Sequence, residues 1–144
     1  MSYPGNLTDE QRAKIEPFFV RPDPRGARAK YPKRRMVEAC LYRLREGCRW
    51  RALPHDSPPC NTLHDHFTRW QERGVWQETV AVLGTRWREH KEGFVPVAFR
   101  WRVERTFAWL GQCRLLAKAY QRTVRSAKAW FWCAMMRLLI RRLA

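Results

Sequence analysis

The chain has 144 residues, enough for one ordinary domain or two small ones. Its net charge of +16 and its pI of about 10.8 favour a polyanion as partner, and nucleic acid is the commonest polyanion. The longest apolar run, 129–136, is too short to span a bilayer, and the N-terminus has no signal-peptide pattern. No membrane partner is therefore expected, and five cysteines without a C-x-x-C pair predict a reduced, cytoplasmic setting.

The first predicted helix starts at Thr8 and runs to about Phe19. Thr8 can cap it, and Gln11, three residues later, completes a capping box. Ile15 and Phe18 or Phe19 are expected on its inner face. Two prolines, at positions 22 and 24, end the helix because proline cannot continue the hydrogen-bond ladder.

A basic segment containing proline and glycine follows at 21–35. It has two open interpretations. One is an arm that lies along phosphates or in a minor groove, with Arg25 and Arg28 as the best candidates for contact. The other is a solvated linker without a specific role, because phosphate attraction needs no fixed geometry. The candidate DNA-binding residues at the end of this segment are Lys33, Arg34 and Arg35.

Helical periodicity then predicts helices at 33–46 and 61–73, with a short helical turn at 50–53 between them. Gly47 and Gly74 end the two helices. Two helices separated by a proline-bounded break in a basic segment suggest a helix-turn-helix unit, with the 61–73 helix as the reader. Asn and Arg can make bidentate contacts to base edges. The candidate DNA-binding residues here are Arg49, Arg51, Asn61, Thr62, Asp65, Thr68 and Arg69.

The second half of the chain is expected to start with a helix at 75–83, ended by Gly84. Segment 85–94 is polar without a clear period and is interpreted as a junction. Segment 94–99 has strand-like residues but a central proline, so it can form at best an edge strand. Helices are predicted at 100–116 and 126–142. The last one is apolar on nearly every side and should therefore be surrounded by other elements.

A single carboxylate stands out in the 100–116 helix. Val103, Phe107 and Leu110 form its apolar stripe, and Glu104 lies on the next face. Glu104 is the only acidic residue after Gly93, in a segment that holds eleven Lys and Arg. It can form an i, i+4 ion pair with Arg100, or it can bind a divalent cation.

Residues 100–110, Arg-Trp-Arg-Val-Glu-Arg-Thr-Phe-Ala-Trp-Leu, resemble the C-terminal signature of bacterial insertion-sequence transposases of the DDE type, in the IS4/IS5 group. The resemblance implies that Glu104 is the third metal-binding carboxylate of a catalytic triad and Arg100 the signature arginine. Gly111 and Val97 stand where the group often has Lys and Tyr. Segments 7–11, 47–54 and 67–70 are similar to the N-terminal domain of the same transposases, which is taken to bind the terminal inverted repeats.

The two catalytic Asp that this family implies are missing. Its chemistry needs two Mg²⁺ ions held by three carboxylates, two of them from a ribonuclease-H-like sheet. The chain has four Asp, none lies after position 65, and none has a strand context. Segment 84–99 is far too short for such a sheet. The predicted fold is therefore mainly α, with the sheet largely absent: a DNA-binding domain at 1–83, a junction at 84–99 and a remnant of the catalytic region at 100–144.

These observations predict an internally deleted transposase-family protein that binds double-stranded inverted-repeat DNA in the bacterial nucleoid. It should be inactive alone, with Mg²⁺ bound at Glu104 only if Asp ligands come from another chain. Two alternatives stay open. The protein could be a subunit completed by a second copy or by an intact transposase. It could also be a non-specific nucleic-acid-binding or decayed product, which would bind with a steep salt dependence but no sequence preference.

Overall fold

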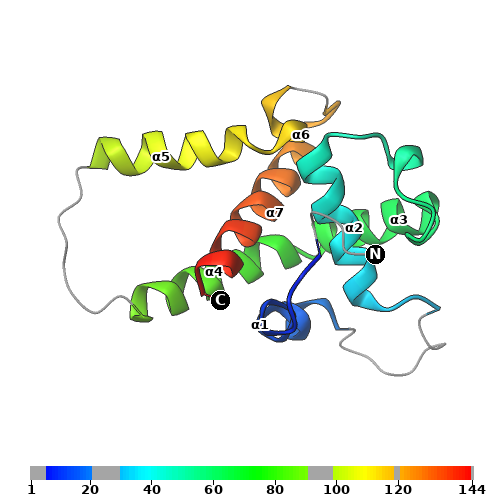
Figure 1. The fold of residues 1–144 in the computed structure, drawn as a ribbon, viewed down its shortest axis with the longest axis horizontal. Coiled ribbons are helices and arrows are strands. Elements are labelled where there is room, and N and C mark those ends of the chain that lie inside the picture. The colour runs from blue at the N-terminus through cyan, green and yellow to red at the C-terminus, as the bar shows by residue number, and fades with distance from the viewer. Residues whose placement is uncertain (1–5, 21–29, 91–98, 119–120, 144) are drawn as a thin grey trace.

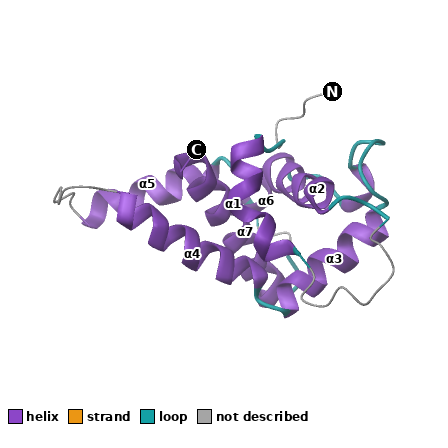
Figure 2. Ribbon diagram, turned by 90° about the horizontal axis from the view of Figure 1, so that it is seen from below, coloured by secondary structure: helices purple, strands orange, loops and turns teal. Residues whose placement is uncertain are grey.

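Helices form most of the described chain, which comprises residues 6–20, 30–90, 99–118 and 121–143 of a computed structural model. Within these residues there is no strand, which confirms the predicted mainly α fold (Figures 1 and 2). The elements in chain order are α1 (Asp9–Phe19), α2 (Lys33–Glu46), the 3₁₀ helix η1 (Trp50–Ala52), α3 (Cys60–Glu72), α4 (Val75–His90), α5 (Phe99–Gly111), α6 (Arg114–Ala117) and α7 (Val124–Leu143).

Helix α7 runs through the middle of the molecule (Figure 1). It packs along α4 and also contacts α2, α1 and α6. The Lys14 ammonium group of α1 donates a hydrogen bond to the Leu143 carbonyl at its end. The expectation that this apolar helix is surrounded is therefore confirmed, and the N-terminal helices surround it. Its buried residues are Ala129, Trp130, Cys133, Ala134, Met136, Leu139 and Ile140.

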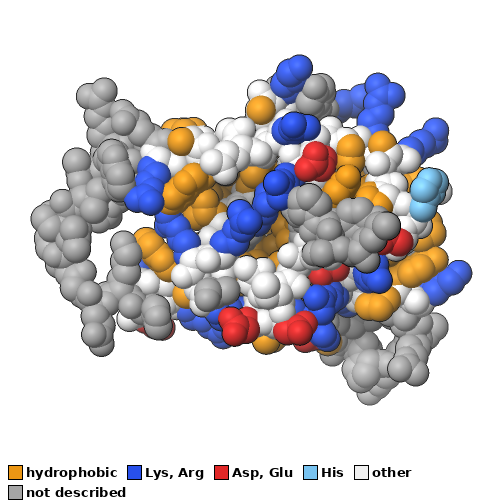
Figure 3. Space-filling view, in the orientation of Figure 1, with side chains coloured by type: hydrophobic (Ala, Val, Ile, Leu, Met, Phe, Trp, Pro, Cys, Tyr) orange, Lys and Arg blue, Asp and Glu red, His pale blue; other side chains and the backbone are white. Residues whose placement is uncertain are grey.

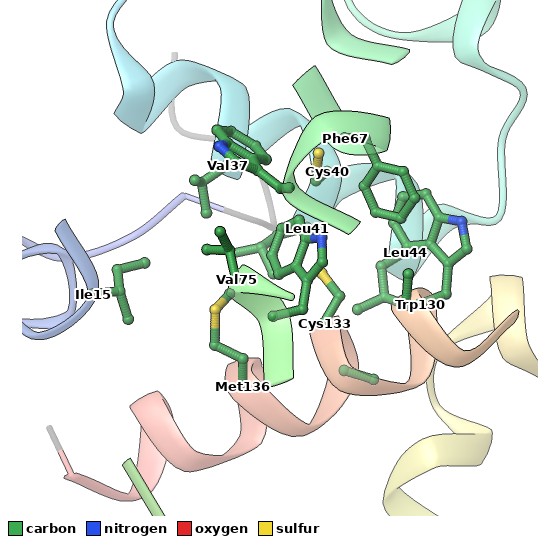
Figure 4. Packing of buried hydrophobic residues seen from close by; sticks show 14 of the residues in the cluster. Ile15, Val37, Cys40, Leu41, Leu44, Phe67, Val75, Trp130, Cys133 and Met136 are labelled. Atoms are coloured by element: carbon green, nitrogen blue, oxygen red, sulfur yellow. The ribbon is translucent and has the colours of Figure 1, made fainter. Parts of the chain in front are cut away.

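Aromatic side chains hold α7 against the N-terminal helices. The rings of Phe67 and Trp130 stack with centroids 4.2 Å apart and an interplanar angle of 17° (Figure 4). Trp76 packs tilted against Phe67, at 5.7 Å, and contacts Phe19 edge to face at 5.3 Å. Such pairs stabilise a core by about 0.5–1.5 kcal/mol each beyond their buried area. One continuous aromatic cluster therefore links α1, α3, α4 and α7.

A buried guanidinium group extends this cluster. The Arg43 side chain lies 4.5 Å from the Trp50 ring centroid and 4.7 Å from that of Trp130, which is cation–π geometry. Its Nε and Nη1 atoms are buried and have no hydrogen-bond partner among the described residues. Burial lowers the pKa of Arg43. The two indole rings are thus the main compensation for the desolvation of this charge.

Local sequence signals placed most helix ends correctly. The Thr8 and Gln11 capping box is present, Ile15 and Phe19 are buried, and Gly47 ends α2 in the left-handed conformation with φ of 67°. Two boundary predictions are wrong. Helix α4 continues through Gly84 to His90, because contacts with α7 outweigh the small cost of a helical glycine. The predicted 100–116 helix is two helices, because the backbone at Cys113 is extended. The proposed edge strand at 94–99 falls mainly outside the described residues, and Phe99 itself begins α5.

Gly47 is expected to be intolerant of a side chain. A Cβ atom there would lie 3.1 Å from the Arg114 Cβ and 3.2 Å from the Arg114 carbonyl carbon, on a backbone whose φ is positive. Gly47→Ala should therefore lower the free energy of unfolding by about 1–3 kcal/mol. Gly84→Ala is the matched control, because its Cβ would meet nothing within 4 Å inside a helix. It should raise the free energy by about 0.5–1 kcal/mol. Chemical denaturation measures both values, and equal effects would contradict the packing described.

Candidate nucleic-acid interface

Helix α3 turns its polar side chains outward. Leu63, Phe67 and Trp70 are buried, whereas the opposite side of the helix is exposed or half-buried. Of the predicted reader residues on that side, Asn61, Asp65 and Arg69 are exposed, and Thr62 and Thr68 are half-buried. The first turn of α3 has no acidic residue and no side-chain cap, so its N–H groups are available to an anion.

Three of these polar groups make local contacts. The Asn61 Oδ1 atom accepts from the Cys60 thiol at 3.6 Å. The Thr68 hydroxyl donates to the His64 carbonyl at 2.9 Å, within the helix. The Asp65 Oδ1 atom lies 4.0 Å from His64 Nδ1, so a protonated His64 would partly offset the negative charge that repels phosphates. Asn61 and Arg69 remain the outward side chains best suited to reading base edges.

The link between α2 and α3 is long. It extends from 47 to 59 and contains η1, whereas a helix-turn-helix motif typically joins its helices by three or four residues. The turn from α3 to α4 is shorter, because Arg73 and Gly74 alone connect them and Gly74 has φ of 68°. The helix-turn-helix unit with α3 as its reader therefore stays a prediction, and the two-residue turn in this part of the chain joins α3 to α4.

A basic pocket of about 200 Å³ lies beside the C-terminal half of α3. Lys33, from the start of α2, reaches the same pocket as Arg69. Two further polar residues line this pocket and were not predicted, His66 and Arg73. Arg73 follows Arg69 by four residues, so helical spacing could have indicated it. Phe19, Trp70 and Glu72 complete the lining. Predicted DNA-binding residues from two helices thus meet in one hollow.

The remaining predicted basic residues differ in their surroundings. The Arg34 guanidinium is held by Glu38 Oε1 and Asp9 Oδ1, each at 2.9 Å, and donates to the Leu7 carbonyl at 2.8 Å. The hydrogen bond to Glu38 is the main reason that the pKa of Arg34 is raised. Arg34 therefore ties the N-terminal segment to α2 and is not free to contact DNA. Arg35 Nη1 lies 3.9 Å from Asp56 Oδ2, and both Arg49 and Arg51 are exposed around η1.

Some of the predicted site residues lie outside the part of the chain that the structure describes. Arg25 and Arg28 lie outside the described residues, as do the side chains of Arg100 and Glu104, although the backbone of both positions belongs to α5. Among the residues that are described, no group of three or more His, Cys, Asp or Glu could hold a metal ion. The described donors therefore do not fit the two-Mg²⁺ centre that the resemblance implies.

Comparison with known proteins identifies a family over the first half of the chain. Residues 7–80, just over half of the chain, match the model of a family described as "Putative transposase of IS4/5 family (DUF4096)". Over 78 residues the chain is 35% identical to a protein of Sinorhizobium fredii (strain NBRC 101917 / NGR234) named "Uncharacterized protein y4sN". That alignment covers 54% of this chain and 62% of the relative, so the chain spans less than two thirds of the relative's length.

No solved structure matches the chain. None of the described helices combines the length and the apolarity that crossing a bilayer requires. The family match includes all of α1 to α3, the turn after α3 and the first six residues of α4. This is the part of the molecule that carries the outward polar face and the basic pocket. By the extent of that match, the chain belongs to the IS4/5 transposase family.

Proposed function

We propose that this protein binds the terminal inverted repeats of an insertion element as duplex DNA and does not cut them by itself. The observation that carries the proposal is the outward polar face of α3, continuous with a pocket in which Lys33 and Arg69 meet. This face lies within the segment that matches the transposase family. Asn61 and Arg69 would read bases, and the surrounding cations would contact phosphates.

Charge supports the phosphate part of the proposal. The chain holds 29 Lys and Arg against 13 Asp and Glu, and the excess runs through its whole length. In the proposed complex Arg73, Arg49 and Arg51 neutralise phosphates beside α3, and Arg25 and Arg28 extend the contact along the duplex. Each neutralised phosphate releases a counterion, so affinity should fall steeply as salt rises.

The short connection between α4 and α5 supports the proposal that the protein does not cut DNA by itself. Helix α4 ends at His90 and α5 begins at Phe99, which leaves only 91–98 where the sheet would have to be inserted. The described Asp residues also have other neighbours: Asp9 pairs with Arg34, Asp56 Oδ2 lies 3.9 Å from Arg35 Nη1, and Asp65 Oδ1 lies 4.0 Å from His64 Nδ1. The proposal therefore gives Glu104 no catalytic role unless another chain, such as an intact transposase, supplies both aspartates.

Arg69→Ala is expected to reduce the preference for inverted-repeat DNA over scrambled DNA by roughly tenfold, because one bidentate base contact contributes about 1–3 kcal/mol of discrimination. The measurement is a binding titration on both duplexes at several salt concentrations. Arg86→Ala is the control, since it removes the same charge from an exposed site on α4. It should weaken binding to both duplexes alike. Equal affinity of the unmodified protein for both duplexes would refute sequence-specific binding.

A further inference from the structure

A second basic pocket lies away from α3, where α5, α7 and the end of α2 meet. Its volume is about 370 Å³. Four arginines line it, one from α2 and three from the C-terminal half of α7, and no acidic residue is among the lining residues. One of the four, Arg45, also has its Nε atom 3.7 Å from Glu46 Oε1. The space-filling view shows Lys and Arg side chains gathered in the region between α5 and α7, next to hydrophobic ones (Figure 3). The four are Arg45, Arg137, Arg141 and Arg142.

The arginines of this pocket are close enough for the positive charge of one to disfavour the charged form of another. Burial, followed by the charges of Arg141 and Arg45, lowers the pKa of Arg137. Burial and the charge of Arg105 lower the pKa of Arg142. The negative end of the α7 dipole favours basic residues in its last turn, which accounts for Arg141 and Arg142 individually. The helix dipole does not explain why Arg141 and Arg142 line the same pocket as Arg45, which belongs to another helix.

The aromatic residue in the pocket, Trp109, bears on which kind of ligand the pocket can bind. The Arg142 guanidinium lies 4.1 Å from the Trp109 ring centroid, and that of Arg105 lies 4.6 Å from it. Guanidinium groups therefore already stack on this ring, and the pocket offers positive charge rather than a platform for a base. The guanidinium group of arginine is planar and can donate two parallel hydrogen bonds to two oxygens of one phosphate group.

We infer that the pocket between α2, α5 and α7 binds a phosphate-bearing anion through Arg45, Arg137 and Arg141. The ligand is either the backbone of a nucleic acid or a free polyphosphate such as pyrophosphate. The pocket shares no residue with the α3 face, so the inference stands apart from the proposed function. It assigns the C-terminal helices a binding role of their own.

Calorimetric titration of the full chain with inorganic pyrophosphate tests the inference. Arg141→Gln should weaken pyrophosphate binding at least fivefold relative to Arg125→Gln, which removes the same charge from an exposed site at the other end of α7. Arg137→Lys keeps the charge but removes the planar guanidinium group, and it should also weaken binding. Equal affinities for the Arg141 and Arg125 variants, or no saturable binding of pyrophosphate, would overturn the inference.

A competition experiment separates the two sources of phosphate. If nucleic-acid backbone enters the pocket, pyrophosphate displaces a scrambled duplex, and Arg141→Gln weakens binding of both ligands. If the ligand is a free polyphosphate, the duplex and pyrophosphate bind independently, and Arg141→Gln affects pyrophosphate alone. Arg69→Ala should leave pyrophosphate affinity unchanged in either case. The experiments can therefore refute phosphate binding in this pocket without refuting DNA binding at the α3 face, and the reverse.

Discussion

Trp130→Ala is expected to leave little folded protein. The Trp130 side chain is 1% exposed, stacks on Phe67 at 4.2 Å and supports the buried Arg43 guanidinium at 4.7 Å. Truncating a buried tryptophan costs about 3–5 kcal/mol, against a total stability of about 5–15 kcal/mol for an ordinary domain. The substitution also removes one of the two rings that compensate the buried charge of Arg43, so the upper end of that range is expected.

Phe131→Ala provides the matched control, because Phe131 is the next residue on α7 and is 38% exposed. It should lower the free energy of unfolding by less than about 1 kcal/mol, as partly exposed substitutions usually do. Denaturant titration followed by circular dichroism measures both variants. Similar, small losses for the two would mean that α7 does not share a core with the N-terminal helices.

This shared core bears on the predicted division of the chain. Helix α7 contacts α1, α2 and α4, so the C-terminal segment packs as part of the N-terminal bundle. The boundaries 1–83, 84–99 and 100–144 therefore remain a proposal about how the chain arose from a longer transposase. Loss of a sheet would leave α7 without its covering, and the contacts with the N-terminal helices supply a new one.

Short-range patterns in the sequence were sufficient for the features that depend on short-range physics. The capping box of α1 needs only two residues three apart, and both of its hydrogen bonds are present at 3.2 Å. Gly47 was predicted from its place after an amphipathic stripe, and it adopts the left-handed conformation. The outward face of α3 follows from the periodicity of Leu63, Phe67 and Trp70 in the same way.

Features that depend on distant partners were not predictable from pattern. Arg34 looked like part of a basic run, yet Asp9, 25 residues away in sequence, helps to fix it in place. Gly84 looked like a helix end, because nothing in its neighbourhood reveals that α7 packs along α4. The pocket that joins Arg45 to Arg137 depends on how α2 and α7 meet, which no local spacing encodes.

The second large effect that we expect is that the isolated protein does not cleave DNA strands. The reaction of DDE transposases needs two metal ions about 4 Å apart, one of which would activate the attacking water or 3′-hydroxyl while the other would stabilise the leaving oxygen. A single glutamate cannot hold both ions. The described donors form no group of three, and segment 91–98 cannot contain the sheet that would carry two aspartates. An active transposase lowers a very high barrier, so losing the metal pair should reduce the rate by many orders of magnitude.

The most direct test uses inverted-repeat duplex already bound to the purified protein. The complex is incubated with Mg²⁺ or Mn²⁺, and the DNA strands are separated on a denaturing gel. We expect retained but intact DNA, with no nicking or joining above that of the duplex alone, and no change on Glu104→Ala. Cleavage that disappears in Glu104→Ala would contradict the claim that this chain binds the ends of an element without cutting them.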